Sequence, residues 1–253
     1  MKYAGNLSVF TLGGTSYLAD FENVSFEISS MMEEGKGGAQ RHSNEVAVKR
    51  EFKASCSLMR TVTSVRQTEL DLAALDLGAI DLLADVRTLT LNVNTVTQEC
   101  SARADQYHTY QAVGTKFSGS GTLQVQDAAT TDLVESMVGT LASLQTTLTI
   151  DLGGTTAELP VTLTKAGYTI ERDGLYIIAF EFTQRGTPTS ISGNTLLALI
   201  LTGTALCAIV TTITTLGNRS GSTLIESCTI NLPEQGILKE TYNFMGLGAP
   251  SVT

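Results

Sequence analysis

The chain has 253 residues, a length that allows one large domain or two small ones with a substantial core. Its 16 basic and 25 acidic residues give a net charge of −9, which excludes a protein that reads DNA by neutralising phosphates. Only 16% of the residues are charged, against about a quarter in typical domains, so the composition predicts a Thr-rich β protein with a largely uncharged surface.

The amino-terminal residues, MKYAGNLSVF, lack the long apolar stretch of a signal peptide. Four cysteines lie far apart, with no CxxC spacing, and are expected to be reduced structural thiols. They are Cys56, Cys100, Cys207 and Cys228.

A long hairpin pattern occurs twice, at residues 23–60 and 88–125, with a constant offset of 65 residues. The offset aligns Phe26 with Leu91 and Phe52 with Phe117. Apolar and polar residues alternate in both copies, which predicts antiparallel strands with one apolar and one polar face. About twelve residues at about 3.3 Å each give strands of about 40 Å, long enough to extend into a barrel wall or a neighbouring subunit.

Polar segments of about 15 residues connect the strands of each predicted hairpin, at 31–45 and 96–111. Loops of this length are usually functional or disordered. Each contains one histidine, His42 or His108, which we expect to be solvated rather than bound to a metal.

Residues 132–144 carry the clearest helix signal. Asp132 and Glu135 form a capping box ahead of an apolar stripe that includes Met137 and Leu141. The equivalent helix of the first copy is expected within residues 61–86. The aspartates of that segment recur every five residues, so they are spread around the expected helix and do not converge on a cation: Asp71, Asp76 and Asp81.

A second repeat joins residues 144–189 to residues 207–252. Four residues, Gly174, Phe182, Gly186 and Pro188, recur as Gly236, Phe244, Gly248 and Pro250 at an offset of 62, whereas Thr169-Ile170 recurs as Thr229-Ile230 at an offset of 60. We interpret the whole chain, 1–253, as two copies of one domain, arranged either in tandem or interleaved. Convergent alternation in unrelated hairpins is the alternative.

The uncharged stretch 196–216 is long enough to span a membrane, but it is rich in Thr and no Lys or Arg cluster flanks it. We therefore predict a buried helix followed by a strand, or two strands. The motifs of nucleotide, metal and hydrolase sites do not occur in the sequence. The sequence thus predicts no enzyme activity, no catalytic or metal-binding residues and no cofactor.

Three segments resemble the major tail tube proteins of long-tailed bacteriophages. They are SGSGTLQVQDAATTDLVESMV at 118–138, GILKETYNFMGLGAP at 236–250 and its earlier echo GLYIIAFEFTQRGTP at 174–188. The resemblance covers most of the chain. It implies a mainly β fold: antiparallel β-sandwich or barrel tube domains with long hairpins and one or two flanking helices, internally duplicated here.

The resemblance also implies a function. In that family, hairpins of adjacent subunits close a β-barrel ring, and rings stack into a hollow tube through which DNA leaves the capsid. Six tube domains usually make a ring, so a duplicated chain needs three copies, a trimer with pseudo-sixfold symmetry. The implied partners are further copies of the chain, the tape-measure protein, tail-end proteins and passing double-stranded DNA. The implied location is the virion tail, assembled in the host cytoplasm, without a membrane span.

The candidate lumen face consists of the polar residues of the predicted strands. They are Ser25, Glu27, Ser29, Glu51, Asn92, Asn94, Ser118, Ser120, Thr122 and Gln124. Lys49, Lys53 and Lys116 share this side, where they can pair with acids across strands. The alternative is the ordinary wet face of a sandwich.

The long loops supply the candidate contacts between stacked rings. These residues are Glu33, Glu34, Lys36, Arg41, His42, Glu99, Arg103, Asp105, Tyr107 and His108. Two other function classes share the composition. A head decoration protein or pilus-like adhesin does not require ring closure, and a carbohydrate-binding β-sandwich requires an exposed aromatic platform, for which only Tyr107 and Tyr110 lie in a loop.

Overall fold

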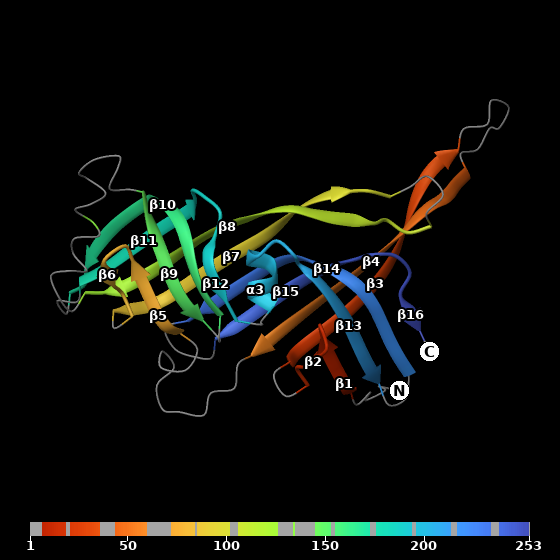
Figure 1. Ribbon diagram of the computed structural model, residues 1–253, viewed down its shortest axis with the longest axis horizontal. Coiled ribbons are helices and arrows are strands. Elements are labelled where there is room, and N and C mark those ends of the chain that lie inside the picture. Colours follow the sequence, from red (N-terminus) through yellow and green to blue (C-terminus); the bar gives the residue numbers. More distant parts are fainter. Residues whose placement is uncertain are drawn as a thin grey trace.

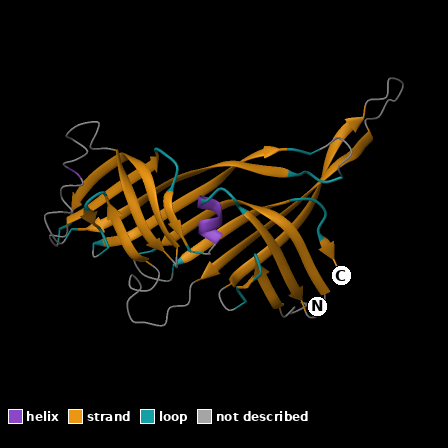
Figure 2. Cartoon of the chain, viewed as in Figure 1, coloured by secondary structure: helices purple, strands orange, loops and turns teal. Residues whose placement is uncertain are grey.

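The computed structural model describes residues 7–18, 21–35, 44–59, 72–83, 85–101, 106–125, 134, 145–152, 155–172, 176–193, 196–213, 217–233 and 238–252. Nearly all of them lie in strands (Figure 2). The strands are β1 (Leu7–Leu12), β2 (Thr15–Ser16), β3 (Phe21–Gly35), β4 (Asn44–Met59), β5 (Leu72–Leu77), β6 (Ile80–Asp81), β7 (Val86–Glu99), β8 (Tyr110–Gln124), β9 (Gln145–Leu152), β10 (Thr155–Ile170), β11 (Tyr176–Gln184), β12 (Thr189–Ser192), β13 (Leu206–Ile213), β14 (Gly217–Leu232), β15 (Lys239–Gly246) and β16 (Ser251–Val252). These strands pair antiparallel, so the prediction of a mainly β, antiparallel fold is confirmed.

The strands fall into two units with the same internal order. One unit runs β2-β1-β13-β14-β15-β4-β3, and the other runs β6-β5-β9-β10-β11-β8-β7. The second unit, β5 to β12, lies in the sequence between β4 and β13 of the first. We therefore call the first the split unit and the second the inserted unit. Figure 1 shows them as two lobes, crossed by the long β7–β8 hairpin.

The hairpins of the two units pair in the same register. In β3–β4 the first pair is Phe21↔Leu58, and in β7–β8 it is Val86↔Leu123, 65 residues later on both strands. Both ladders are interrupted at equivalent places: between Phe21/Asn23 and Val86/Thr88, and between Met31/Met32 and Val96/Thr97.

The carboxyl-terminal strands of the two units correspond at an offset of 62. Leu163↔Phe182 precedes an irregularity in β10–β11, and Ile225↔Phe244 precedes one in β14–β15. The offset of 62 holds along these ladders, so the offset of 60 predicted for the Thr-Ile pairs does not apply. A shift of two residues leaves every side chain on its face, so sequence similarity cannot distinguish the two registers.

Apolar side chains of both units form one core. Residues on the inner face of β7, such as Leu89, Leu91 and Val93, are buried. On β8 the inner positions Gly119 and Gly121 lie directly against the rings of Phe182 and Phe180. The prediction that the small residues of this strand serve close packing on one side is thus confirmed.

The apolar stretch 196–216 forms a helix followed by a strand, as one of the two predicted forms. Helix α3 (Leu196–Leu201) is almost fully buried, and β13 follows it. In the part of the chain that the structure describes, no helix has the length and hydropathy needed to cross a membrane.

The helix expected within residues 61–86 is wrong from residue 72 onward. Strands β5 and β6 occupy this segment, and β5 pairs with β9. Asp76 and Asp81 therefore lie opposite each other across a hairpin, and Asp71 lies outside the described residues. Burial of Leu75 and Leu77 between paired strands outweighs the helix propensity of a Leu- and Ala-rich segment. Of the helix predicted at 132–144, Val134 alone is described, and it is helical.

The two long hairpins extend further than predicted. Strand β3 continues to Gly35 and β4 begins at Asn44, while β7 continues to Glu99 and β8 begins at Tyr110. Most of the segments 31–45 and 96–111 is therefore paired strand. Polar residues on both faces hide this from a pattern search, because a hairpin arm without a buried face does not alternate.

Candidate functional site: the polar face of a continuous sheet

Eight strands form one continuous sheet across both lobes, in the order β3-β4-β15-β14-β7-β8-β11-β10. The two units join where residues 227–232 of β14 pair with residues 89–94 of β7. One face of this sheet packs on the core, and the other carries polar residues. We call the second face the polar face.

The ten predicted lumen residues share the polar face. Residues paired across antiparallel strands lie on the same side of a sheet, so the register can be followed from strand to strand. One row runs from Ser25 through six strands: Ser25, Ser55, Asn243, Ser227, Asn94 and Lys116. Alternation along β3, β4, β7 and β8 places the rest of the predicted set on the same face.

The sequence search missed the central part of this surface. Residues of β14 and β15, such as Ser227, Thr229 and Asn243, lie between the two hairpins and complete the rows. Their strands alternate in the sequence as clearly as the hairpins do. Only the pairing of β14 with β7, more than 130 positions apart, brings them together with Asn92 and Asn94.

Neutral hydrogen bonds connect neighbouring strands on the polar face. The hydroxyls of Ser25 and Ser55 are 2.7 Å apart. Asn243 Nδ2 donates to Ser227 Oγ at 2.8 Å, and Thr229 Oγ1 donates to Asn92 Oδ1 at 3.1 Å. The face thus presents hydroxyl and amide groups that are partly satisfied by one another.

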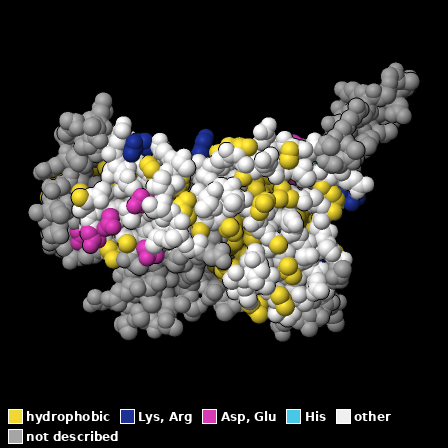
Figure 3. All heavy atoms as spheres, in the orientation of Figure 1, with side chains coloured by type: hydrophobic (Ala, Val, Ile, Leu, Met, Phe, Trp, Pro, Cys, Tyr) yellow, Lys and Arg dark blue, Asp and Glu magenta, His cyan; other side chains and the backbone are white. Residues whose placement is uncertain are grey.

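Several cations of this face have acidic partners. Lys53 Nζ lies 3.2 Å from Glu51 Oε2, and Lys165 Nζ lies 3.1 Å from Glu181 Oε1. Such exposed pairs contribute at most about 1 kcal/mol to stability. Their effect here is on the field, because each lysine has an opposite charge beside it. Figure 3 shows few charged side chains on the visible face of the molecule and broad uncharged areas.

A second polar cluster joins the two long hairpins. His108 Nδ1 lies 2.7 Å and Lys49 Nζ 3.4 Å from Glu99 Oε1. The backbone amide of Arg50 donates to Gln106, and that of His108 donates to Arg50. His108 is only 9% exposed, so the expectation of a solvated histidine is wrong for this residue. The loop folds back on β4, which removes the ring from water.

The other predicted loop residues divide into two groups. Tyr107 forms a bridge with Arg50, beside the cluster just described. Glu33 and Glu34 lie on β3, near its end. The remaining ones lie outside the described residues: Lys36, Arg41, His42, Arg103 and Asp105.

The pKa of Glu99 gives this cluster an acid-sensitive contact. Hydrogen bonds from Ser101 and His108, together with Lys49, lower the pKa of Glu99 from 4.5 to about 2. A lowered folded-state pKa stabilises the contact above pH 4.5, and this contribution is lost as the pH falls towards 2. We expect amide exchange at Arg50 and His108 to lose protection in that pH window. A Glu99→Gln variant should lack this response. An equal loss in the variant would contradict the assignment.

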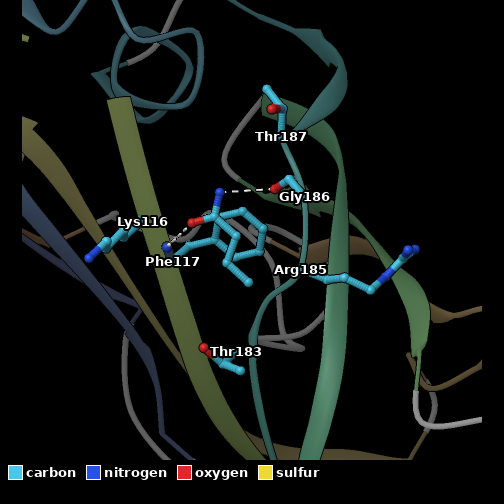
Figure 4. A pocket seen from close by; sticks show the side chains of 7 residues that line it. Lys116, Phe117, Thr183, Arg185, Gly186 and Thr187 are labelled. Atoms are coloured by element: carbon cyan, nitrogen blue, oxygen red, sulfur yellow. Dashed lines mark hydrogen bonds between the residues drawn. The ribbon is translucent and has the colours of Figure 1, made fainter. Parts of the chain in front are cut away.

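A hollow of about 510 Å³ lies beside β8 and the end of β11 (Figure 4). Gln184 joins its two sides, because its Oε1 accepts from the Phe117 amide at 3.2 Å and its Nε2 donates to the Gly186 carbonyl at 2.9 Å. The side chains of Lys116 and Arg185 extend in opposite directions. The cationic groups therefore do not converge on one point, as they do in a phosphate-binding site.

The buried thiols have the chemistry of structural residues. Burial raises the pKa of Cys56 to about 12 and that of Cys207 to about 11, and it raises the pKa of Cys228 well above its ordinary value. A thiol that does not ionise near neutral pH is a poor nucleophile and metal ligand. Among the described residues, no group of three or more His, Cys, Asp or Glu side chains is arranged to hold a metal ion.

Two solved structures share part of this arrangement. A chain of the virion of a native gene transfer agent (GTA) particle aligns with a TM-score of 0.38 and 17% identity, over 49% of this chain and 96% of that chain. A chain from the tail of an empty GTA particle with C6 symmetry aligns with a TM-score of 0.31 and 17% identity, over 44% of this chain and 83% of that chain. No family model and no curated protein matches the sequence. Both TM-scores are below 0.5, so neither likeness assigns a function to this chain.

Proposed function

We propose that this chain is the structural subunit of a phage tail tube, in which its copies form hollow rings that stack into a conduit for the genome. The observation that carries this proposal is the eight-strand sheet, which crosses both lobes and ends at β3 and β10. An open strand edge invites pairing with another chain, and closure into a barrel removes such edges. A sheet of this kind is suited to become one segment of a larger closed wall.

The proposed ring contains three chains with pseudo-sixfold symmetry. Each chain contributes two tube domains, of which the inserted unit, residues 72–192, interrupts the split unit between β4 and β13. The equal strand order, the constant offsets of 65 and 62 and the shared positions of the ladder irregularities support an interleaved duplication. Unrelated sheets have no reason to repeat their irregularities at a fixed spacing.

The polar face is proposed to line the bore. Tight DNA binding requires several free lysines or arginines that displace counterions from phosphates. The polar face instead carries hydroxyls and amides, its lysines 53 and 165 have acidic partners, and the whole chain has a net charge of −9. Such a lining lets double-stranded DNA slide without holding it. The further proposed partners are the tape-measure protein and the tail-end proteins, in a tail assembled in the host cytoplasm.

The test is the mass and shape of the purified protein, measured by multi-angle light scattering and negative-stain imaging of the same sample. We expect hollow rings or tubes with three chains per ring. Six chains per ring would retain the tube and contradict the two-domain chain. A monomer at all concentrations, even with isolated tail ends added as initiators, would contradict the tube and favour a decoration protein or a glycan-binding module.

A further inference from the structure

Two strand edges of the continuous sheet lack a partner among the described residues. Strand β3 pairs only with β4, and residues 165–170 of β10 pair only with β11, since β9 ends opposite Thr162. Both edges carry exposed apolar side chains. Ile28 on β3 is 53% exposed, and Tyr168 and Ile170 on β10 are 59% and 64% exposed.

The junction between the two units shows what such edges do when they meet. Residues 89–94 of β7 pair with residues 227–232 of β14. The apolar residues on the inner face of this internal junction are each exposed by 3% or less: Leu89, Leu91, Val93, Cys228, Ile230 and Leu232. On the other face, Thr90 Oγ1 donates to Asn231 Oδ1 at 3.3 Å.

The same two strand segments are the open ones elsewhere in the chain. By the offset of 65, residues 89–94 of β7 correspond to residues 24–29 of β3. By the offset of 62, residues 227–232 of β14 correspond to residues 165–170 of β10. The chain thus contains each half of the internal junction twice, once joined and once open.

We propose that residues 24–29 of β3 in one copy pair antiparallel with residues 165–170 of β10 in a second copy, in the register of the internal junction. This inference rests on the proposed ring-forming function and specifies its subunit contact. The register gives six pairs: Val24↔Ile170, Ser25↔Thr169, Phe26↔Tyr168, Glu27↔Gly167, Ile28↔Ala166 and Ser29↔Lys165.

The proposed pairs match in chemistry on both faces. Apolar residues meet on the inner face, where Ile28, Tyr168 and Ile170 would leave water as their counterparts Val93, Ile230 and Leu232 do. Polar residues meet on the other face, where Lys165 and Glu27 lie diagonally across the strands, within reach of an ion pair.

A side-chain contact of the internal junction can also be repeated. The buried hydroxyl of Thr95 donates to the Ile225 carbonyl at 2.6 Å. The corresponding residues are Ser30, which retains a hydroxyl, and Leu163.

The occupant of each edge must be a second copy of the chain. Six strands separate β3 from β10 within one sheet: β4, β15, β14, β7, β8 and β11. The two edges of one chain therefore lie in different lobes (Figure 1). A contact that repeats the internal junction alternates with it around a ring, so the polar face continues from chain to chain.

Disulfide cross-linking of the assembled protein tests the register. In a Cys100→Ser background, Ser25→Cys and Thr169→Cys are combined, because their counterparts Thr90 and Asn231 are in side-chain contact. The matched control combines Ser29→Cys with Thr169→Cys, displaced by four residues or about 13 Å. All three positions are at the surface of the single chain, and the buried native thiols do not compete.

After mild oxidation of rings, we expect the first variant to form covalent dimers and higher multimers, and the control to remain largely monomeric on a non-reducing gel. Rings in which the first variant stays monomeric, or in which both variants cross-link equally, would overturn the proposed register while leaving the tube function intact. Failure of the unmodified protein to form rings at all would instead contradict the proposed function, and the subunit contact with it.

Discussion

A single Ile170→Asp substitution is expected to abolish ring assembly while leaving the chain folded. Ile170 is 64% exposed in the single chain, so the new carboxylate remains hydrated before assembly. In the proposed contact it would be buried opposite Val24 without a cation beside it. An unpaired buried charge costs several kcal/mol, which corresponds to a loss of at least about 100-fold in association constant. Sedimentation velocity over a range of concentrations measures the shift to monomer.

The matched control for this substitution is Leu206→Asp. Leu206 is similarly exposed, at 60%, but the corresponding position in the inserted unit is Gln145. A polar counterpart indicates that this position is not part of a repeated apolar contact. The control is expected to assemble like the original protein. Loss of assembly in both variants, or in neither, would contradict the assignment of the β10 edge.

A Gly119→Ala substitution is expected to destabilise the folded chain by about 1–3 kcal/mol. A Cβ atom at this position would lie 2.4 Å from Phe182 Cζ and 2.4 Å from the Thr90 carbonyl oxygen. The ring can shift only into a packed core, and the carbonyl belongs to the neighbouring strand of the sheet. Chemical denaturation monitored by circular dichroism gives the change in the free energy of unfolding.

Gly114→Ala in the same strand is the control for Gly119→Ala. The nearest atom to its added Cβ would be Val96 Cβ at 3.9 Å, an ordinary contact. We expect the free energy of unfolding of this variant to stay the same or to rise slightly, since alanine restricts the unfolded chain more than glycine does. If the two substitutions cost the same, close packing against Phe182 is not the reason for glycine at position 119.

The candidate polar face could be predicted from the sequence only in part. The residues of β3, β4, β7 and β8 were identifiable because alternation with a period of two is a local property. The intervening strands β14 and β15 alternate too, but nothing local indicates that they lie between the hairpins. The buried state of His108 was also not predictable, because it depends on a loop folding back onto β4 from more than 50 residues away.

The sequence by itself determined the mainly β fold, the two faces of the long hairpins and the 65-residue repeat between them. These features follow from burial of one strand face, which leaves its period in the residues. The tertiary structure decided that residues 72–77 form a strand, that the carboxyl-terminal strands correspond at 62 rather than 60, and that one unit lies within the other. The reason is that strands such as β1 and β13 find each other across about 200 residues, and a register shift of two residues changes partners without changing faces.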